Sequence, residues 1–136
     1  MRRAMGIAML AFAVACGSDK ISGANSESII GSYALKTVNG EALPTVVLQG
    51  PDDKLEVTAG TLDLHTDGSY LLVFNLRETQ GTTVTDDESI ESGTYTRSST
   101  AVTFHPSDPS ANWTASYAAG GTLTVSEDGV VFVFHR

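Results

Sequence analysis

The sequence predicts an all-β domain, and two observations carry this prediction. The first is a repeated motif: the stretch 60–74, GTLDLHTDGSYLLVF, returns at 121–134 as GTLTVSEDGVVFVF. Each copy has an alternating apolar run, an Asp-Gly pair and a second apolar run, which is the pattern of a β-hairpin. The second is a series of about eight or nine short apolar runs at regular spacing, without sustained helical periodicity. We expect a small antiparallel up-and-down barrel of about eight strands, with a β-sandwich as the alternative.

The first 15 residues have the organisation of a secretory signal peptide. Arg2 and Arg3 form a basic n-region, and about twelve apolar or small residues follow, within the usual length of an h-region. This run is too short to span a bilayer, which takes roughly 20 apolar residues. It ends at Cys16, the only cysteine in the chain, so no intramolecular disulfide can form.

The end of this run, Val14-Ala15-Cys16, resembles the lipobox of bacterial lipoproteins, in which the cysteine is acylated and becomes the new N-terminus. The resemblance implies removal of residues 1–15 and a bilayer anchor of acyl chains, such as palmitate, on Cys16. Ala13 departs from the motif, which usually has Leu, Val or Ile there, and ordinary signal cleavage is the alternative. Asp after the cysteine would imply inner-membrane retention. Because Gly17 is in that place, we expect the outer membrane, facing the periplasm.

The segment 17–28, GSDKISGANSES, is rich in glycine, serine, asparagine and charge, so we predict a flexible tether. Together with Cys16 it makes up region 16–28. The folded domain is expected at 29–136, which is roughly 110 residues and therefore one domain.

The expected strands follow in order along the domain. The first covers 29–38 and ends at the Asn39-Gly40 turn, and short runs at 45–49 and 55–58 lead into the repeated hairpin. The polar, acidic segment 80–91, QGTTVTDDESIE, is predicted to be a loop. A hairpin over 93–105, a strand at 112–117 and the second copy of the motif complete the series.

The two copies of the motif favour different turns. In the first, a three-residue loop, Thr66-Asp67-Gly68, is favoured over a two-residue loop because it gives one consistently apolar face. In the second, a two-residue loop is favoured for the same reason. The apolar face of the first copy comprises Leu62, Leu64, Tyr70, Leu72 and Phe74, and that of the second Leu123, Val125, Phe132 and Phe134. Leu71 and Val73 then fall on the solvent face.

Three short motifs resemble those of small lipocalin-like domains in bacterial lipoproteins. Gly31-Ser32-Tyr33 stands in the place of the opening G-x-W of lipocalins, with Tyr33 for tryptophan, and Asp67-Gly68-Ser69-Tyr70 and Ser92-Gly93-Thr94-Tyr95 resemble their recurring turns. The resemblance covers most of 29–136 and implies a lipocalin-like barrel.

The acidic composition excludes a nucleic-acid partner. The formal net charge is −8, and such a surface repels phosphate backbones and anionic headgroups. The cluster Asp86, Asp87, Glu88 and Glu91 lacks the spacing of a calcium loop, so a solvated loop is preferred. The histidines His65, His105 and His135 could form a zinc site only if the fold brought them together, and nothing in the sequence does so.

The sequence predicts no enzyme and no cofactor. There is no G-x-S-x-G nucleophile motif. Asp63 and Glu91 could in principle be paired catalytic carboxylates, but both are equally explained as residues on the solvent face of strands.

Two functions from different classes remain. A barrel lined by Tyr33, Tyr70, Phe74 and Trp113 would bind a small hydrophobic or amphiphilic ligand, with Trp113 as a gate or lid near the barrel mouth. Alternatively, the same side chains fill the core, and the lipoprotein has a structural or protein-interaction role in the envelope. Leu71 and Val73 are the hint for that alternative, because exposed apolar residues often mark interfaces.

Overall fold

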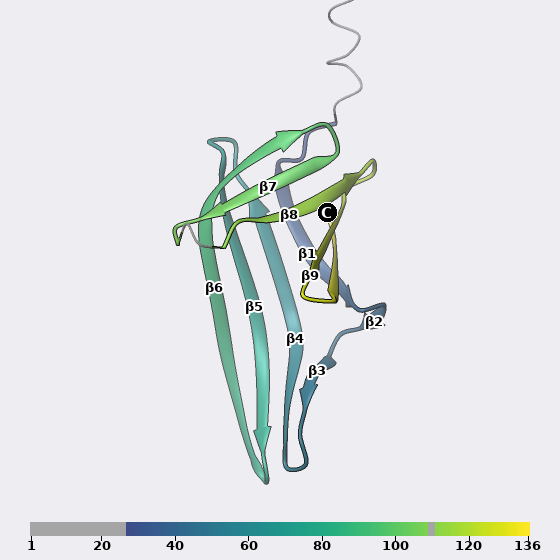
Figure 1. Ribbon diagram of the computed structural model, residues 1–136, viewed down its shortest axis with the longest axis vertical. Coiled ribbons are helices and arrows are strands. Elements are labelled where there is room, and N and C mark those ends of the chain that lie inside the picture. Colours follow the sequence, from purple (N-terminus) through teal and green to yellow (C-terminus); the bar gives the residue numbers. More distant parts are fainter. Residues whose placement is uncertain (1–26, 109–110) are drawn as a thin grey trace, which may run out of the picture.

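The computed structural model describes residues 27–108 and 111–136, and within them the chain is built from antiparallel strands (Figure 1). The strands are β1 Gly31–Val38, β2 Glu41–Ala42, β3 Thr45–Gln49, β4 Asp53–Leu64, β5 Ser69–Gln80, β6 Thr83–Ser98, β7 Ala101–Pro106, β8 Trp113–Ala118, β9 Thr122–Glu127 and β10 Val130–His135.

The sheet closes into a barrel. From β4 to β10 each strand pairs with the next one in sequence, and β1 pairs with β10 on one side and with β4 on the other. The barrel therefore consists of β1 and β4–β10, with β2 and β3 added outside it. This confirms the small up-and-down barrel of eight strands and excludes the sandwich.

Both turns of the repeated motif are confirmed. In the first copy Leu64 pairs with Tyr70, and the His65 backbone N–H donates to the Ser69 carbonyl, which leaves a three-residue loop with Gly68 at φ 85°. In the second, Glu127 pairs with Val130 across Asp128-Gly129, whose φ angles are 50° and 79°. Positive φ at both loop residues is characteristic of the type I′ turn, the two-residue turn whose twist matches that of the flanking strands.

The barrel interior is filled by the apolar faces that the sequence predicted. The largest fully buried side chains are Tyr33, Tyr70, Phe104, Phe134, Leu62, Leu64, Leu123, Val38 and Val102. An eight-stranded barrel is just wide enough for side chains to fill it. Any ligand must therefore be sought at an end of the barrel.

The predicted loop at 80–91 is wrong. Residues 83–91 belong to β6, which pairs with β5 from Thr83 to Thr94 without a break, and only Gly81 and Thr82 form the turn. Every side chain from Thr83 to Ile90 is exposed, so the segment has no burial pattern that sequence reasoning could detect. The strand exists because β5 supplies a continuous row of backbone partners.

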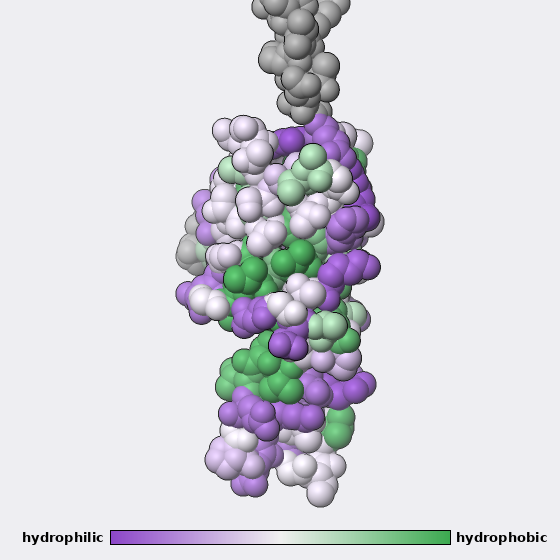
Figure 2. Space-filling model, turned by 90° about the vertical axis from the view of Figure 1, so that its right-hand side faces the viewer, coloured by the Kyte–Doolittle hydropathy of each residue, from purple (hydrophilic) through white to green (hydrophobic). Residues whose placement is uncertain are grey.

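These long strands project beyond the barrel as an arm. The arm comprises β3 together with residues 53–57 of β4, 76–80 of β5 and 83–90 of β6, and it extends below the barrel in Figure 1. β6 pairs with β7 only from Gly93 onward, so the arm has a free edge along β6. Figure 2 shows apolar surface on the arm, on the side of the molecule that carries β3.

The opposite end of the barrel is closed by charged residues around the first described position. The Glu27 carboxylate forms an ion pair with Arg136 at 2.7 Å and accepts a hydrogen bond from the Gly120 backbone N–H at 3.0 Å. Arg97 donates to the Glu27 carbonyl oxygen and lies over the Tyr117 ring. The chain thus enters the barrel at the end remote from the arm.

Candidate functional site

The end of the barrel that faces the arm contains a pocket of about 160 Å³, which we call the mouth pocket. Six of its eight lining residues are apolar, and the other two are glutamates. The lining comprises Leu72, Phe74, Glu91, Trp113, Val125, Glu127, Phe132 and Phe134. Phe74 and Trp113, two of the four predicted ligand-binding residues, therefore lie in one pocket.

Two groups of aromatic rings build the walls of the mouth pocket. On one side the Trp113 ring stacks on Phe104 with centroids 3.8 Å apart and planes inclined by 9°. On the other side Phe74 lies 5.4 Å from Phe132 and 6.2 Å from Phe134. Aromatic pairs of this kind stabilise the ring positions more than the burial of apolar area alone would. The pocket walls are therefore preorganised.

Glu91 occupies the polar side of the mouth pocket. Its Oε1 accepts a 2.6 Å hydrogen bond from the Tyr70 hydroxyl and a 2.7 Å hydrogen bond from Trp113 Nε1. Both bonds use the same oxygen, and across the described ranges Oε2 accepts no hydrogen bond. One carboxylate oxygen is thus available to a ligand, beside an apolar surface.

The predicted solvent-face position of Glu91 is wrong. Glu91 pairs with Leu72 across β5 and β6, so it shares the inner face of the sheet with the buried apolar residues. The sequence carries a signal for this, because Glu91 stands two positions before Gly93 and four before the aromatic Tyr95, which places all three on one face of a strand. Asp63 does lie on the outer face, where it accepts a 2.5 Å hydrogen bond from the Ser32 hydroxyl.

Tyr70 lies beneath the mouth pocket and is 2% exposed. Burial, followed by its hydrogen bond to Glu91, raises the pKa of the Tyr70 phenol well above the usual value of 10. Tyr70 therefore acts as a permanent donor that fixes the Glu91 carboxylate. It supports the pocket without lining it.

Tyr33 lies away from the mouth pocket, at the end of the barrel that carries Glu27 and Arg136. It is fully buried, its hydroxyl donates a 2.6 Å hydrogen bond to the Ile29 carbonyl, and Arg136 lies 5.7 Å above its ring. The fold therefore brings together Phe74, Trp113 and, beneath them, Tyr70, but not Tyr33.

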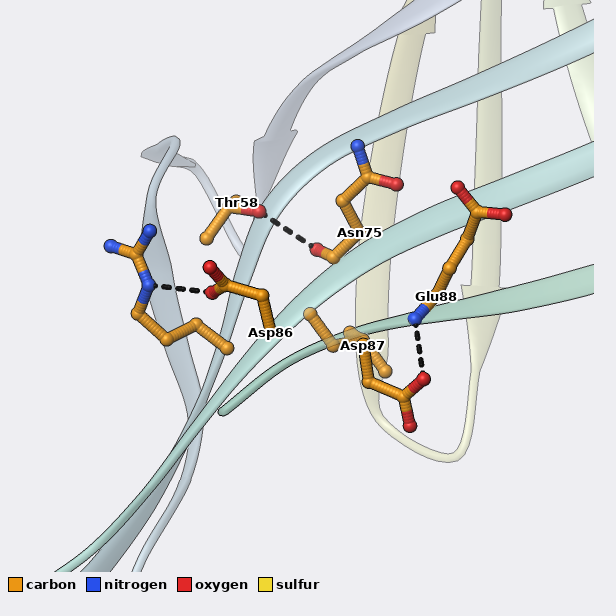
Figure 3. Close-up of a pocket in the computed structure, with 7 residues that line it drawn as sticks. Thr58, Asn75, Asp86, Asp87 and Glu88 are labelled. Carbon is orange, nitrogen blue, oxygen red and sulfur yellow. Dashed lines mark hydrogen bonds and ion pairs between the residues drawn. The ribbon is translucent and has the colours of Figure 1, made fainter. Parts of the chain in front are cut away.

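A second, larger hollow lies on the outer face of the arm, where Thr58 bulges out of the ladder between β4 and β5 (Figure 3). It is an open groove of about 570 Å³ with polar walls. Arg77, its only cation, forms an ion pair with Asp86 at 2.9 Å. Figure 3 shows that the side chains of Asp87 and Glu88 point in opposite directions, so the acidic residues do not converge on one ligand.

The structure places the remaining candidates apart from the mouth pocket. His65 is exposed beside the turn between β4 and β5, His105 lies 3.4 Å from the Thr96 hydroxyl, and His135 is exposed at the end of β10. Among the described residues, no three His, Cys, Asp or Glu side chains are grouped as a metal site. Cys16 and the predicted signal peptide lie outside the described residues.

Comparisons of the chain with protein-family models, with curated proteins and with solved structures found no match. In the described part of the chain, no helix combines the length and the apolar composition that crossing a membrane requires.

Proposed function

We propose that this protein is a lipid-anchored, extracytoplasmic lipoprotein that binds the apolar part of a small amphiphilic ligand in the mouth pocket. The observation that carries the proposal is the pocket itself, an apolar recess at the end of an otherwise filled barrel. Its walls are aromatic and held by mutual packing, which is typical of ligand pockets that are formed before binding.

The volume of the pocket limits what it can hold. Pockets that enclose drug-sized ligands measure roughly 300–1,000 Å³, and the mouth pocket, at about 160 Å³, is smaller. An apolar cavity of about 150 Å³ accommodates a benzene ring. The mouth pocket therefore suits a single ring or a short alkyl segment, with the rest of the ligand extending along the arm.

The position of the pocket is compatible with an anchor at Cys16. Glu27 lies at the end of the barrel opposite the arm, bound to Gly120 and Arg136. An acylated Cys16 would therefore attach the domain to the bilayer through the end that is already closed. The mouth pocket and the arm would stay accessible from the solvent.

Fluorescence of Trp113 tests ligand binding directly, because it is the only tryptophan in the chain and it lines the pocket. The mature chain with Cys16→Ser, which carries no acyl chains, is titrated with hexanol. We expect a saturable change in emission that Val125→Phe abolishes by filling the pocket, and that the outer-face variant Val73→Phe retains. A linear response, or one that Val125→Phe leaves intact, contradicts the proposal.

Lipidation is tested in cells by metabolic labelling with an alkyne palmitate analogue, followed by membrane fractionation. We expect label and membrane association for the full-length protein, and neither for Cys16→Ser. The adjacent variant Gly17→Ser, which keeps the cysteine, is the matched control. Equal labelling of the native protein and Cys16→Ser would refute the anchor without bearing on the pocket.

The arm favours a second candidate function, protein interaction. Its strand β3 exposes three consecutive apolar side chains, Val46 at 41%, Val47 at 37% and Leu48 at 66%. A photo-crosslinking amino acid at Leu48 would then give specific adducts in the protein's own host, and one at the exposed Thr61 would not. Equal patterns at both positions would remove this candidate.

A further inference from the structure

The mouth pocket combines an apolar wall with two carboxylates, and this combination defines the chemistry of its ligand. Glu91 and Glu127 are the charged members of the lining, and the remaining lining residues are aliphatic or aromatic. A ligand whose apolar part enters this pocket places its polar end beside negative charge.

The side-chain hydrogen-bond donor that lines the mouth pocket is already engaged. Trp113 Nε1 is the only donor among the side chains that line it, and it is bound to Glu91 Oε1. The Tyr70 hydroxyl beneath the pocket is bound to the same oxygen. A ligand carboxylate or phosphate would therefore meet two carboxylates and no free donor among these lining side chains, which is unfavourable in a partly buried site.

The basic residues of the described chain lie elsewhere. Arg97 and Arg136 bind Glu27 at the opposite end of the barrel. Lys54 and Arg77 form ion pairs with Glu56 and Asp86, whose register places them on the outer face of the arm. Lys36 is exposed on β1. Within residues 27–108 and 111–136 no cation therefore offsets the two glutamates of the pocket, and the excess of acidic residues over the whole chain adds to the negative potential there.

We propose that the ligand of the mouth pocket is a cationic amphiphile: an amine with a short alkyl or aromatic group. The ammonium group donates to the free Oε2 of Glu91, lies near Glu127 and faces the aromatic rings of the wall, which attract cations through their π-electrons. The apolar group occupies the space between Trp113 and Phe74. This inference rests on the proposed function, since it assigns a ligand class to the same pocket.

Three ligands with the same alkyl chain test the proposal: hexylamine, hexanol and hexanoate. Each is titrated against the mature Cys16→Ser chain, with Trp113 fluorescence and isothermal titration calorimetry as the readouts. We expect hexylamine to bind about tenfold more tightly than hexanol, as one additional charge-assisted hydrogen bond implies, and hexanoate to bind more weakly than hexanol. Added salt should weaken the binding of hexylamine alone.

Glu91→Gln isolates the contribution of the charge. The glutamine carbonyl still accepts hydrogen bonds from Tyr70 and Trp113, so the pocket is retained while the negative charge is lost. We expect this variant to reduce hexylamine affinity about tenfold and to reduce hexanol affinity much less, because hexanol carries no charge. Glu88→Gln is the matched control, because Glu88 lies on the same strand with its side chain on the opposite face of the sheet. It should change neither affinity.

The outcomes separate the inference from the proposed function. Equal affinities for all three ligands, or tighter binding of hexanoate, overturn the cationic ligand class while leaving an apolar binding pocket. An equal loss of hexylamine affinity in Glu88→Gln and Glu91→Gln also overturns it, because the effect is then one of net charge alone. If none of the three ligands binds, both the inference and the proposed function fail.

Discussion

Trp113 Nε1 donates a 2.7 Å hydrogen bond to the carboxylate of Glu91, 22 positions earlier in the chain. The two residues belong to β8 and β6, which are separated in the sheet by β7. The bond therefore joins non-adjacent strands across the barrel mouth, next to the point where β6 leaves the barrel for the arm. Tyr70 on β5 donates to the same oxygen, so Glu91 links three strands.

Tyr70→Phe should destabilise the domain. The substitution keeps the buried ring and removes the donor to Glu91, and a hydrogen bond to a charged group contributes about 1.5–3 kcal/mol to the free energy of unfolding. Urea unfolding of the native chain and the variant measures the difference. Combining Tyr70→Phe with Glu91→Leu, which removes the acceptor of the hydrogen bond, in a double-mutant cycle gives the coupling between the two residues. If the two single effects simply add, the proposed role of Glu91 as a link between strands is wrong.

Alkaline pH should unfold the domain, and the tyrosines should ionise together with unfolding. Burial raises the pKa values of Tyr33, Tyr70, Tyr95 and Tyr117 above 10.0. Below the pKa of tyrosine in the unfolded chain, the stability of the folded state with its neutral tyrosines is fully present. As the pH rises above that pKa, the unfolded state loses protons that the folded state keeps, and stability falls.

Tyrosinate absorbance and far-ultraviolet circular dichroism should therefore change in the same pH range, above about 10. Tyr70→Phe should lose less stability across that range than the native chain, because it has one fewer group to ionise. Complete tyrosine ionisation in a chain that keeps its native spectrum would contradict this prediction.

Glu27 should contribute to resistance against acid. The hydrogen bond from the Gly120 backbone N–H lowers the pKa of Glu27 below its usual 4.5, and the ion pair with Arg136 adds to this effect. As the pH falls, the unfolded state binds a proton at Glu27 before the folded state does. The stabilisation that Glu27 provides above its unfolded pKa is therefore lost as the pH falls through its folded pKa.

Glu27→Gln should therefore be less stable than the native chain at neutral pH and should lose less stability on acidification below about pH 4.5. The midpoint of acid unfolding and urea titrations at several pH values measure this. Glu41→Gln, at an exposed position on β2, is the control for the loss of one negative charge. Identical pH profiles for Glu27→Gln and the native chain would refute the prediction.

Gly93→Ala should destabilise the domain by at least about 2 kcal/mol. A Cβ at Gly93 would overlap the carbonyl oxygen of His105 and lie 2.8 Å from the Pro106 Cα on the neighbouring strand β7. These are backbone atoms, which cannot move aside as a side chain can. Ser92→Ala, at an exposed neighbouring position, should have little effect. Thermal unfolding compares the two variants. Equal melting temperatures would show that β6 and β7 accommodate the added methyl group without a loss of stability, and would contradict the prediction.

Local sequence patterns predicted the hairpins and their faces. Asp-Gly and Asn-Gly pairs adopt the conformations that tight turns require, and a change of one residue in loop length reverses which side chains face the core. Burial of Leu64 and Tyr70 therefore follows from residues within ten positions of each other. Such information is contained in a short stretch of sequence.

The mouth pocket could be predicted only in part. Phe74 and Trp113 were identifiable as large apolar residues, but their meeting depends on pairings that link strands far apart in the chain. The sequence predicts a loop or the solvent face of a strand for Glu91, because its neighbours are polar and acidic. Its strand is held by backbone pairing to β5, and backbone pairing leaves no pattern in side-chain polarity.

The pairing of β1 with β10 has a consequence for how the domain reaches its native state. Ala34 pairs with His135, so the two contacting segments are separated by roughly 100 residues. The barrel cannot close until residues 130–135 lie between β1 and β9, and until then these two strands present unpaired edges. Contacts of such high sequence separation slow folding. The folding chain is therefore most open to chaperones, and to pairing with other chains, until β10 docks between β1 and β9.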